Sequence, residues 1–304
     1  MVVSINSFSY SLNLIRNYTE LSSQPKKLLF KIYCLDKYVY RRYVKRNNVN
    51  SIFLVDFKTQ KGSVGHALGL AKCLENLEVG SINILSDVDV FIVRKNWDDV
   101  LKQQVLLQTP TISNLKSIGV LGTTYENFSG FSSGTSTTQN YKNKPTLTWC
   151  ALSPDYDFKL MKVMPDKANV LLIDDDNLSE IYELPIGFSL LKDVGWQLPL
   201  YLHENSIPYK VFEHIKPTDD KSIVLRDAYP YHDEFHLNGS PFLVHQRGSM
   251  KHVYRLDKIS RNFYSKVDNY LNKPAWLMKP KFHDYFNFLY KKIRNIIVKA
   301  KKYK

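Results

Sequence analysis

The chain has 304 residues, of which 44% are apolar and 23% are charged, so it can bury a large core and is not disordered in bulk. It contains no run of about 18 apolar residues, which excludes a membrane-spanning helix. The net charge of +13 lies at the two ends: residues 1–50 carry +7, residues 291–304 carry +7, and residues 51–290 carry −1. A neutral middle disfavours a nucleic-acid-binding face, and the basic ends favour contact with an acidic surface such as a membrane.

The cysteines point to a reducing compartment. Cys34, Cys73 and Cys150 lie far apart, without the spacing of a disulfide framework or a zinc site. The first residues, Met1–Tyr10, also lack the basic segment and the following apolar segment of a secretory signal peptide. We therefore expect a cytoplasmic protein, with peripheral contact to the inner face of a membrane as a further expectation.

In the first third of the chain, apolar β-branched runs alternate with helical patterns. This alternation is typical of βαβ units and predicts an α/β fold with a mostly parallel, Rossmann-like sheet flanked by helices. The predicted strands are Val2–Ser7, Leu28–Leu35, Ser51–Phe57 and Ser81–Leu85, and the predicted helices are Ser11–Leu21, Lys37–Arg46 and His66–Leu77.

The pattern is less regular from residue 102 onward. Residues 128–143 are rich in Ser, Thr, Gly and Asn and predict a long mobile loop, which is the usual character of a lid or binding loop. Later elements are a helix from Asp193 to about Glu204, strands at Tyr209–Phe212 and Pro241–His245, and a helix near Val253–Leu271. We expect one domain over residues 1–255, made of two parts (1–101 and 102–255), and a helical C-terminal appendage (256–304).

The most informative motif is Asp87-Val88-Asp89, which directly follows a predicted buried strand. Ligands of open parallel sheets bind at the carboxyl ends of the strands. If the chain turns there, both carboxylates can approach one divalent cation, and hard oxygen ligands suit Mg²⁺ or Mn²⁺. The alternative is that the two aspartates occupy an ordinary solvated turn.

The segments around this motif are similar to the core of GT-A glycosyltransferases, in which a glycine-containing loop and helix lead into a strand that ends in a DxD motif. The matching residues are Gly65–Leu70 (GHALGL) and Ile82–Ile92 (INILSDVDVFI). The resemblance implies a nucleotide-sugar donor, with a UDP-sugar favoured, whose diphosphate is held through Mn²⁺ or Mg²⁺ near Asp87 and Asp89. It further implies that Asp36 contacts the base or ribose, although a surface turn explains Asp36 equally well.

The resemblance also implies that residues 1–255 form the catalytic domain, with a nucleotide-sugar-binding half at 1–101 and an acceptor half at 102–255. Two later segments extend the resemblance. His245 ends the strand Pro241–His245, where many GT-A enzymes supply a further metal ligand, and Arg247 and Lys251 follow it as cations for the leaving diphosphate. The alternative for His245 is a half-buried structural histidine.

Asp193 matches the catalytic base of inverting members, although Lys192 stands where a first acid is expected. An N-cap explains Asp193 without catalysis. Asp233 and Glu234 compete for the role of base.

The sequence thus predicts a metal-dependent glycosyltransferase that moves a sugar to an acceptor hydroxyl on a glycan, a lipid-linked molecule or another acceptor, with inversion. A retaining enzyme is one alternative, and a non-catalytic nucleic-acid-binding or membrane-binding protein is another. Residues 282–300 carry apolar side chains at spacings of three and four, with lysines between them, which predicts a basic amphipathic helix suited to a bilayer surface. The alternative is that this apolar stripe packs on the domain and leaves the lysines in solvent.

Overall fold

The structure is a computed structural model of the whole chain. It describes residues 2–4, 8–34, 51–54, 63–105, 117–132, 135–163, 170–192, 195–230, 232–246 and 258–273. Asp36, the predicted helix Lys37–Arg46, Asp193, Arg247, Lys251 and the basic stretch 282–300 lie outside these residues.

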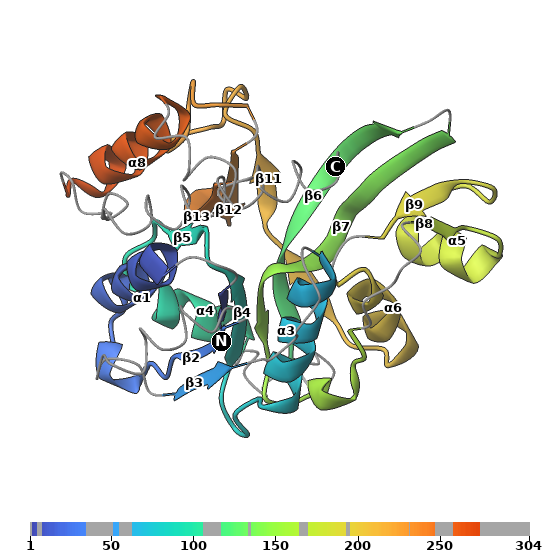
Figure 1. Cartoon of the computed structure of the whole chain (residues 1–304), viewed down its shortest axis with the longest axis horizontal. Helices are drawn as coiled ribbons and strands as arrows, with labels where there is room; N and C mark the ends of the chain where they lie inside the picture. Colours follow the sequence, from blue (N-terminus) through green and yellow to red (C-terminus); the bar gives the residue numbers. More distant parts are fainter. Residues whose placement is uncertain are drawn as a thin grey trace, which may run out of the picture.

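Two sheets form the framework of the fold (Figure 1). The larger sheet has the strand order β10-β6-β7-β4-β1-β2-β3, with β9 paired to β7 and β8 paired to β9. Its strands are β1 (Val2–Ser4), β2 (Lys31–Cys34), β3 (Ser51–Leu54), β4 (Asn83–Asp87), β6 (Val120–Ser132), β7 (Thr135–Leu152), β8 (Val170–Leu172), β9 (Ser189–Leu191) and β10 (Tyr209–Val211). The smaller sheet has the order β11-β12-β13-β5 and consists of β5 (Val90–Ile92), β11 (Glu213–Ile215), β12 (Asp233–Leu237) and β13 (Ser240–His245).

Helices cover both sheets. The α-helices are α1 (Phe8–Leu21), α3 (Ser63–Glu75), α4 (Trp97–Val105), α5 (Asp176–Tyr182), α6 (Gln197–Glu204) and α8 (Lys258–Leu271), and the short 3₁₀ helices are η1 (Pro25–Lys27) and η2 (Phe158–Leu160). Within the described residues, no helix combines the length and the apolar character needed to cross a bilayer.

The expectation of a mostly parallel sheet is wrong. Only part of the larger sheet is parallel, namely the pairs β1–β2, β2–β3, β1–β4, β6–β10 and β7–β9. The pairs β4–β7, β6–β7 and β8–β9 are antiparallel, and so is every pair of the smaller sheet. The fold is therefore a mixed α/β structure in which antiparallel pairing predominates.

One source of the error is the stretch that we expected to be a mobile loop, residues 128–143. Residues 128–132 and 135–143 belong to the antiparallel strands β6 and β7, which extend away from the rest of the sheet, with β8, β9 and α5 beside them (Figure 1). The stretch lacks apolar alternation, but its threonines are β-branched and favour extended backbone. At Thr137 and Thr138, β7 also pairs with β9, which adds a further strand beside this antiparallel pair.

A second source of error is the smaller sheet, in which the neighbouring strands β12 and β13 form an antiparallel hairpin with a tight turn. Asn238 and Gly239 join β12 to β13 with φ values of 52° and 74°. A two-residue loop with positive φ at both positions matches the type I′ turn that antiparallel hairpins prefer, and Asn-Gly is the dipeptide that favours this turn most strongly. This signal predicts an antiparallel pair.

Alternating residues of β7 divide the interior into two cores. Trp149 and Ala151 pack in a core with α1, α4, α8 and the smaller sheet, whereas Cys150 and Leu152 face a second core with α3 and α6. This follows from the two-residue period of a strand, whose successive side chains point to opposite faces. The first core includes Phe263 of α8, so this helix packs against the same interior as α1.

Candidate metal centre

The Asp87–Asp89 segment is the point where the chain leaves one sheet and enters the other. Asp87 is the last residue of β4 in the larger sheet, Val88 and Asp89 form a turn, and Val90 begins β5 in the smaller sheet. Val88 is buried, while both aspartate side chains remain partly exposed. The turn therefore keeps two carboxylates near the surface while the apolar residue between them is anchored inside.

His245 reaches this turn because of strand pairing. It ends β13, whose antiparallel register with β5 places His245 opposite Val90. The next residue, Gln246, donates its backbone N–H to the carbonyl oxygen of Asp89 at 3.0 Å, which ties the end of β13 to the turn. The pairing therefore brings together residues 156 positions apart in the sequence.

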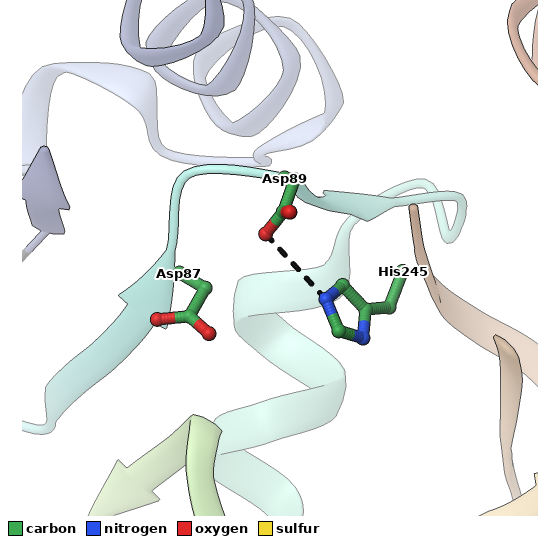
Figure 2. A group of neighbouring side chains, drawn as sticks. All are labelled: Asp87, Asp89 and His245. Atoms are coloured by element: carbon green, nitrogen blue, oxygen red, sulfur yellow. Dashed lines mark ion pairs between the residues drawn. The ribbon is translucent and has the colours of Figure 1, made fainter. Parts of the chain in front are cut away.

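The three side chains converge as the sequence predicts (Figure 2). One ligand atom from each of Asp87, Asp89 and His245 lies within 4.8 Å of those of the other two, and the Nε2 atom of His245 lies 3.5 Å from Oδ1 of Asp89. Among the described residues, no other group of three histidine, cysteine or acidic side chains converges in this way. The side chains of Asp87, Asp89 and His245 are 22%, 13% and 11% exposed, respectively, so solvent and a ligand can reach them.

Buried hydrogen bonds fix the backbone behind the site. The side chain of Asn17 on α1 accepts from the N–H of Ile92 at 2.7 Å and donates to its carbonyl oxygen at 2.9 Å, and so acts as a clamp on β5. On the β4 side, the hydroxyl of Tyr18 lies 3.1 Å from Ser86 Oγ and accepts from Nε1 of Trp149 at 2.8 Å. The strands on either side of the Asp87–Asp89 turn, β4 and β5, are therefore both tied to α1.

His66 is a neighbour of the site that the sequence analysis did not assign. It lies in the first turns of α3, within the GHALGL segment, and its Nε2 atom is 2.8 Å from Oδ1 of Asp87. Its place in the segment Gly65–Leu70, which precedes the strand that ends in Asp87, gave no indication by itself that His66 contacts Asp87. This contact restrains the Asp87 carboxylate. Among the described residues, Asp87 forms no other ion pair.

On the side away from Asp89, the His245 ring contacts Tyr125 and Asp233. Its Nδ1 atom is 3.0 Å from the hydroxyl of Tyr125 and 3.4 Å from Oδ2 of Asp233, and the Oδ1 atom of Asp233 is 2.8 Å from Nε2 of His214. Burial alone would lower the pKa of His245, but Asp89 and Asp233 outweigh it and raise the pKa to about 9. In the metal-free protein the imidazole is therefore cationic at neutral pH, and a cation must displace its proton.

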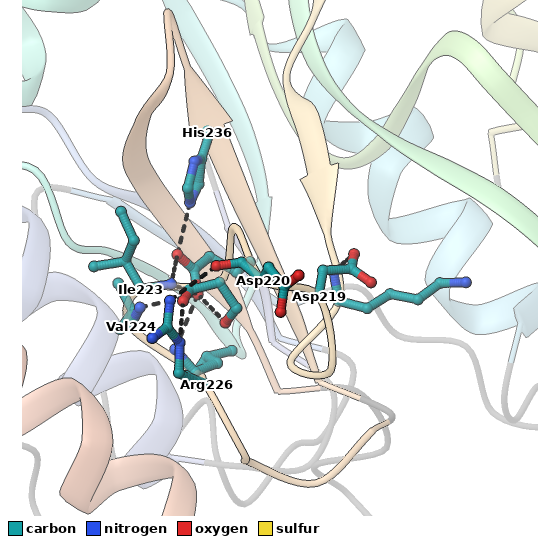
Figure 3. A network of polar contacts seen from close by, with 10 residues as sticks. Asp219, Asp220, Ile223, Val224, Arg226 and His236 are labelled. Carbon is teal, nitrogen blue, oxygen red and sulfur yellow. Dashed lines mark hydrogen bonds and ion pairs between the residues drawn. The ribbon is translucent and has the colours of Figure 1, made fainter.

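Glu234, a rival candidate for the catalytic base, is buried and hydrogen-bonded as a structural residue. Its side chain is fully buried and accepts hydrogen bonds from Ser222 Oγ, from backbone N–H groups of residues 223–225 and from His236 Nε2 (Figure 3). Burial would raise its pKa, but these hydrogen bonds lower the pKa below its usual value. Glu234 therefore holds the loop of residues 222–225 against β12 and is out of reach of an acceptor hydroxyl. Asp233, the other rival, is 3% exposed and lies against His214 and His245.

Comparison with known proteins gives no family. No family model, no curated protein and no solved structure matches this chain. The functional argument therefore rests on the chemistry of the site.

Two carboxylates and one imidazole form a donor set that fits Mn²⁺ or Mg²⁺. Oxygen ligands suit both ions, and imidazole is acceptable to Mn²⁺ once two carboxylates compensate the charge. Such ions usually bind through a few protein carboxylates and share their remaining positions with water and substrate phosphates. The partial exposure of all three side chains is consistent with an open site of this kind.

Proposed function

We propose that this protein is a metal-dependent glycosyltransferase that uses a nucleotide-diphosphate sugar, with a UDP-sugar favoured. The observation that carries the proposal is the convergence of Asp87, Asp89 and His245 at the carboxyl end of β4, next to the parallel strand β1. Carboxyl ends of parallel strands are where α/β proteins bind nucleotides. A diphosphate is the substrate group that such a partly open divalent site is suited to hold.

In this proposal, Asp87, Asp89 and His245 hold Mn²⁺ or Mg²⁺. When bound, the ion supplies Lewis-acid stabilisation to the charge that develops on the leaving nucleoside diphosphate. His66 restrains Asp87 through the 2.8 Å contact between them. Three further roles remain predictions from the sequence. Asp36 would contact the nucleotide base or ribose, and Arg247 and Lys251 would be cations for the leaving diphosphate.

We propose inversion at the anomeric carbon, with Asp193 removing the proton from the acceptor hydroxyl. General base catalysis contributes about 10²- to 10⁴-fold. The buried environments of Glu234 and Asp233 support Asp193 over these two rivals. A retaining reaction is the alternative outcome, and the anomeric proton signal of the product in NMR distinguishes the two.

The test is release of UDP from a panel of UDP-sugars in the presence of Mn²⁺. We expect release that EDTA abolishes and that Asp89→Asn lowers by about 100-fold or more, because the variant loses an anionic ligand. Asp99→Asn is the matched control, since Asp99 lies nearby in the sequence on α4 and pairs with Lys102 at 3.4 Å. Release that is independent of metal, or equal in both variants, would refute the proposal.

We propose a cytoplasmic location for the enzyme. Cys73 and Cys150 are buried free thiols, which fits a reducing compartment. Contact with the inner face of a membrane through the basic stretch 282–300 would place the site near a lipid-linked acceptor.

A further inference from the structure

We infer that Asp233 is a positioning residue, which holds the imidazole of His245 with its Nε2 atom directed toward the metal centre. The inference rests on the proposed metal site and adds to it the group that orients its nitrogen ligand. Ligating histidines generally donate their second N–H to a carboxylate, a carbonyl oxygen or water, and this partner fixes the ring and its tautomer.

The two ring nitrogens of His245 face different neighbours. Nε2 faces Asp89, whose Oδ1 atom is 3.5 Å away, as Figure 2 shows. Nδ1 faces Asp233 Oδ2 at 3.4 Å and the Tyr125 hydroxyl at 3.0 Å. An ionised carboxylate only accepts hydrogen bonds, so Asp233 favours a proton on Nδ1. Nε2, on the side of Asp87 and Asp89, is then the nitrogen whose proton a metal ion would displace.

Asp233 is itself held in place. It lies on β12 directly opposite His245 on β13, so the two side chains form a cross-strand pair. His214 Nε2 contacts its Oδ1 atom at 2.8 Å, and the His214 ring stacks on Phe235 with centroids 5.3 Å apart. The carboxylate is 3% exposed. It therefore acts on the metal centre through His245 and is too buried to meet an acceptor.

The neighbouring residue provides a matched control. Glu234 is also a buried carboxylate of β12, but successive side chains of a strand point to opposite faces. Its partners are the loop of residues 222–225 and His236; of these, Figure 3 labels Ile223, Val224 and His236. Glu234→Gln therefore removes a buried charge from the same strand without removing a partner of His245.

The test measures Mn²⁺ binding by EPR and the ¹⁴N coupling of the bound ion by pulsed EPR, at a temperature below the melting transition of every variant. The wild-type protein should bind Mn²⁺ and show coupling to one imidazole nitrogen, which His245→Ala removes. Asp233→Asn should weaken Mn²⁺ affinity by about 10- to 100-fold and reduce the coupling, whereas Glu234→Gln should change neither. If Asp233→Asn does not fold, Asp233→Ser replaces it with the same expectation.

The outcomes separate this inference from the proposed function. Wild-type affinity and coupling in the Asp233 variant would overturn the inference and leave the metal site intact. Mn²⁺ binding without any ¹⁴N coupling in the wild-type protein would also overturn it, since His245 would then not be a ligand. No Mn²⁺ binding by the wild-type protein would overturn both.

Discussion

At the residue scale, the site consists of a small set of ligands and the groups that restrain them. The Asp-x-Asp motif after an apolar strand indicated Asp87 and Asp89 as ligands, and the resemblance to GT-A glycosyltransferases implied His245 as a further ligand. It did not indicate how they are restrained. The contact of His66 with Asp87 depends on how α3 packs on the sheet, and this packing has no local sequence signal.

His66→Ala should weaken Mn²⁺ affinity by about tenfold, because the carboxylate of Asp87 loses the 2.8 Å contact that orients it. His66→Gln should recover part of the affinity, since its amide can still donate a hydrogen bond to Asp87. Titration of both variants with Mn²⁺ measures the effect. Equal affinities in the wild-type protein and the alanine variant would show that His66 does not orient Asp87.

Another residue-scale effect concerns pH. The hydrogen bonds to Glu234 lower its pKa, so the stability that it contributes is complete above the ordinary glutamate pKa of about 4.3 and is lost as the pH falls through its lowered pKa. Glu234→Gln should lower the free energy of unfolding by about 3 kcal/mol at pH 7, because donors in the buried loop lose a charged acceptor.

Urea unfolding at pH 7 and at pH 3 tests this effect of Glu234. The difference between the wild-type protein and Glu234→Gln should shrink at pH 3, because below about pH 4.3 the carboxyl of the unfolded chain binds a proton and the contribution of the charge to stability declines. A difference that stays constant between the two pH values would show that the charge of Glu234 does not contribute to stability.

At the scale of elements, the order of the described strands and α-helices as far as β4 could be predicted, because apolar runs and helical periodicity are local. The pairing of β5 with β13 could not be predicted in this way, since the two strands are about 150 residues apart. The strand β12 is fully buried yet contains Asp233, Glu234 and His236, so its polar residues hide it from a search for apolar alternation.

The clamp between α1 and β5 gives an element-scale prediction. Asn17→Ala should lower the free energy of unfolding by about 2 kcal/mol, because the N–H and carbonyl of Ile92 both lose a buried partner. Asn205→Ala is the control, since its side chain donates to Tyr201 on the exposed surface and its loss should cost less than about 0.5 kcal/mol. Urea unfolding measures both, and equal effects would contradict the role of the clamp.

At the scale of the whole molecule, charge separates the ends of the chain from its middle. The sequence predicts that the basic stretch 282–300 binds an anionic bilayer, where each Lys or Arg contributes about 1 kcal/mol near the surface. The full chain should sediment with vesicles that contain anionic lipid, and less so at high salt because ions screen the attraction. A chain that ends at Lys279 should not sediment. Equal sedimentation of the two would contradict the prediction.

The arrangement of the two sheets explains why the site lies where it does. The chain passes from β4 of the larger sheet to β5 of the smaller one at Asp87–Asp89, and β13 brings His245 to the same place. The resemblance to GT-A glycosyltransferases predicted this convergence of side chains. It was accompanied by the expectation of a mostly parallel sheet, which is wrong. The mixed sheets build the same group of ligands through antiparallel pairing.

The central claim is that Asp87, Asp89 and His245 bind a divalent cation. Anomalous diffraction from crystals of the protein soaked in Mn²⁺ tests it most directly. The account predicts an anomalous peak within coordination distance, about 2.0–2.3 Å, of a carboxylate oxygen of each aspartate and of Nε2 of His245. A peak elsewhere, or none at these side chains at saturating Mn²⁺, would contradict it.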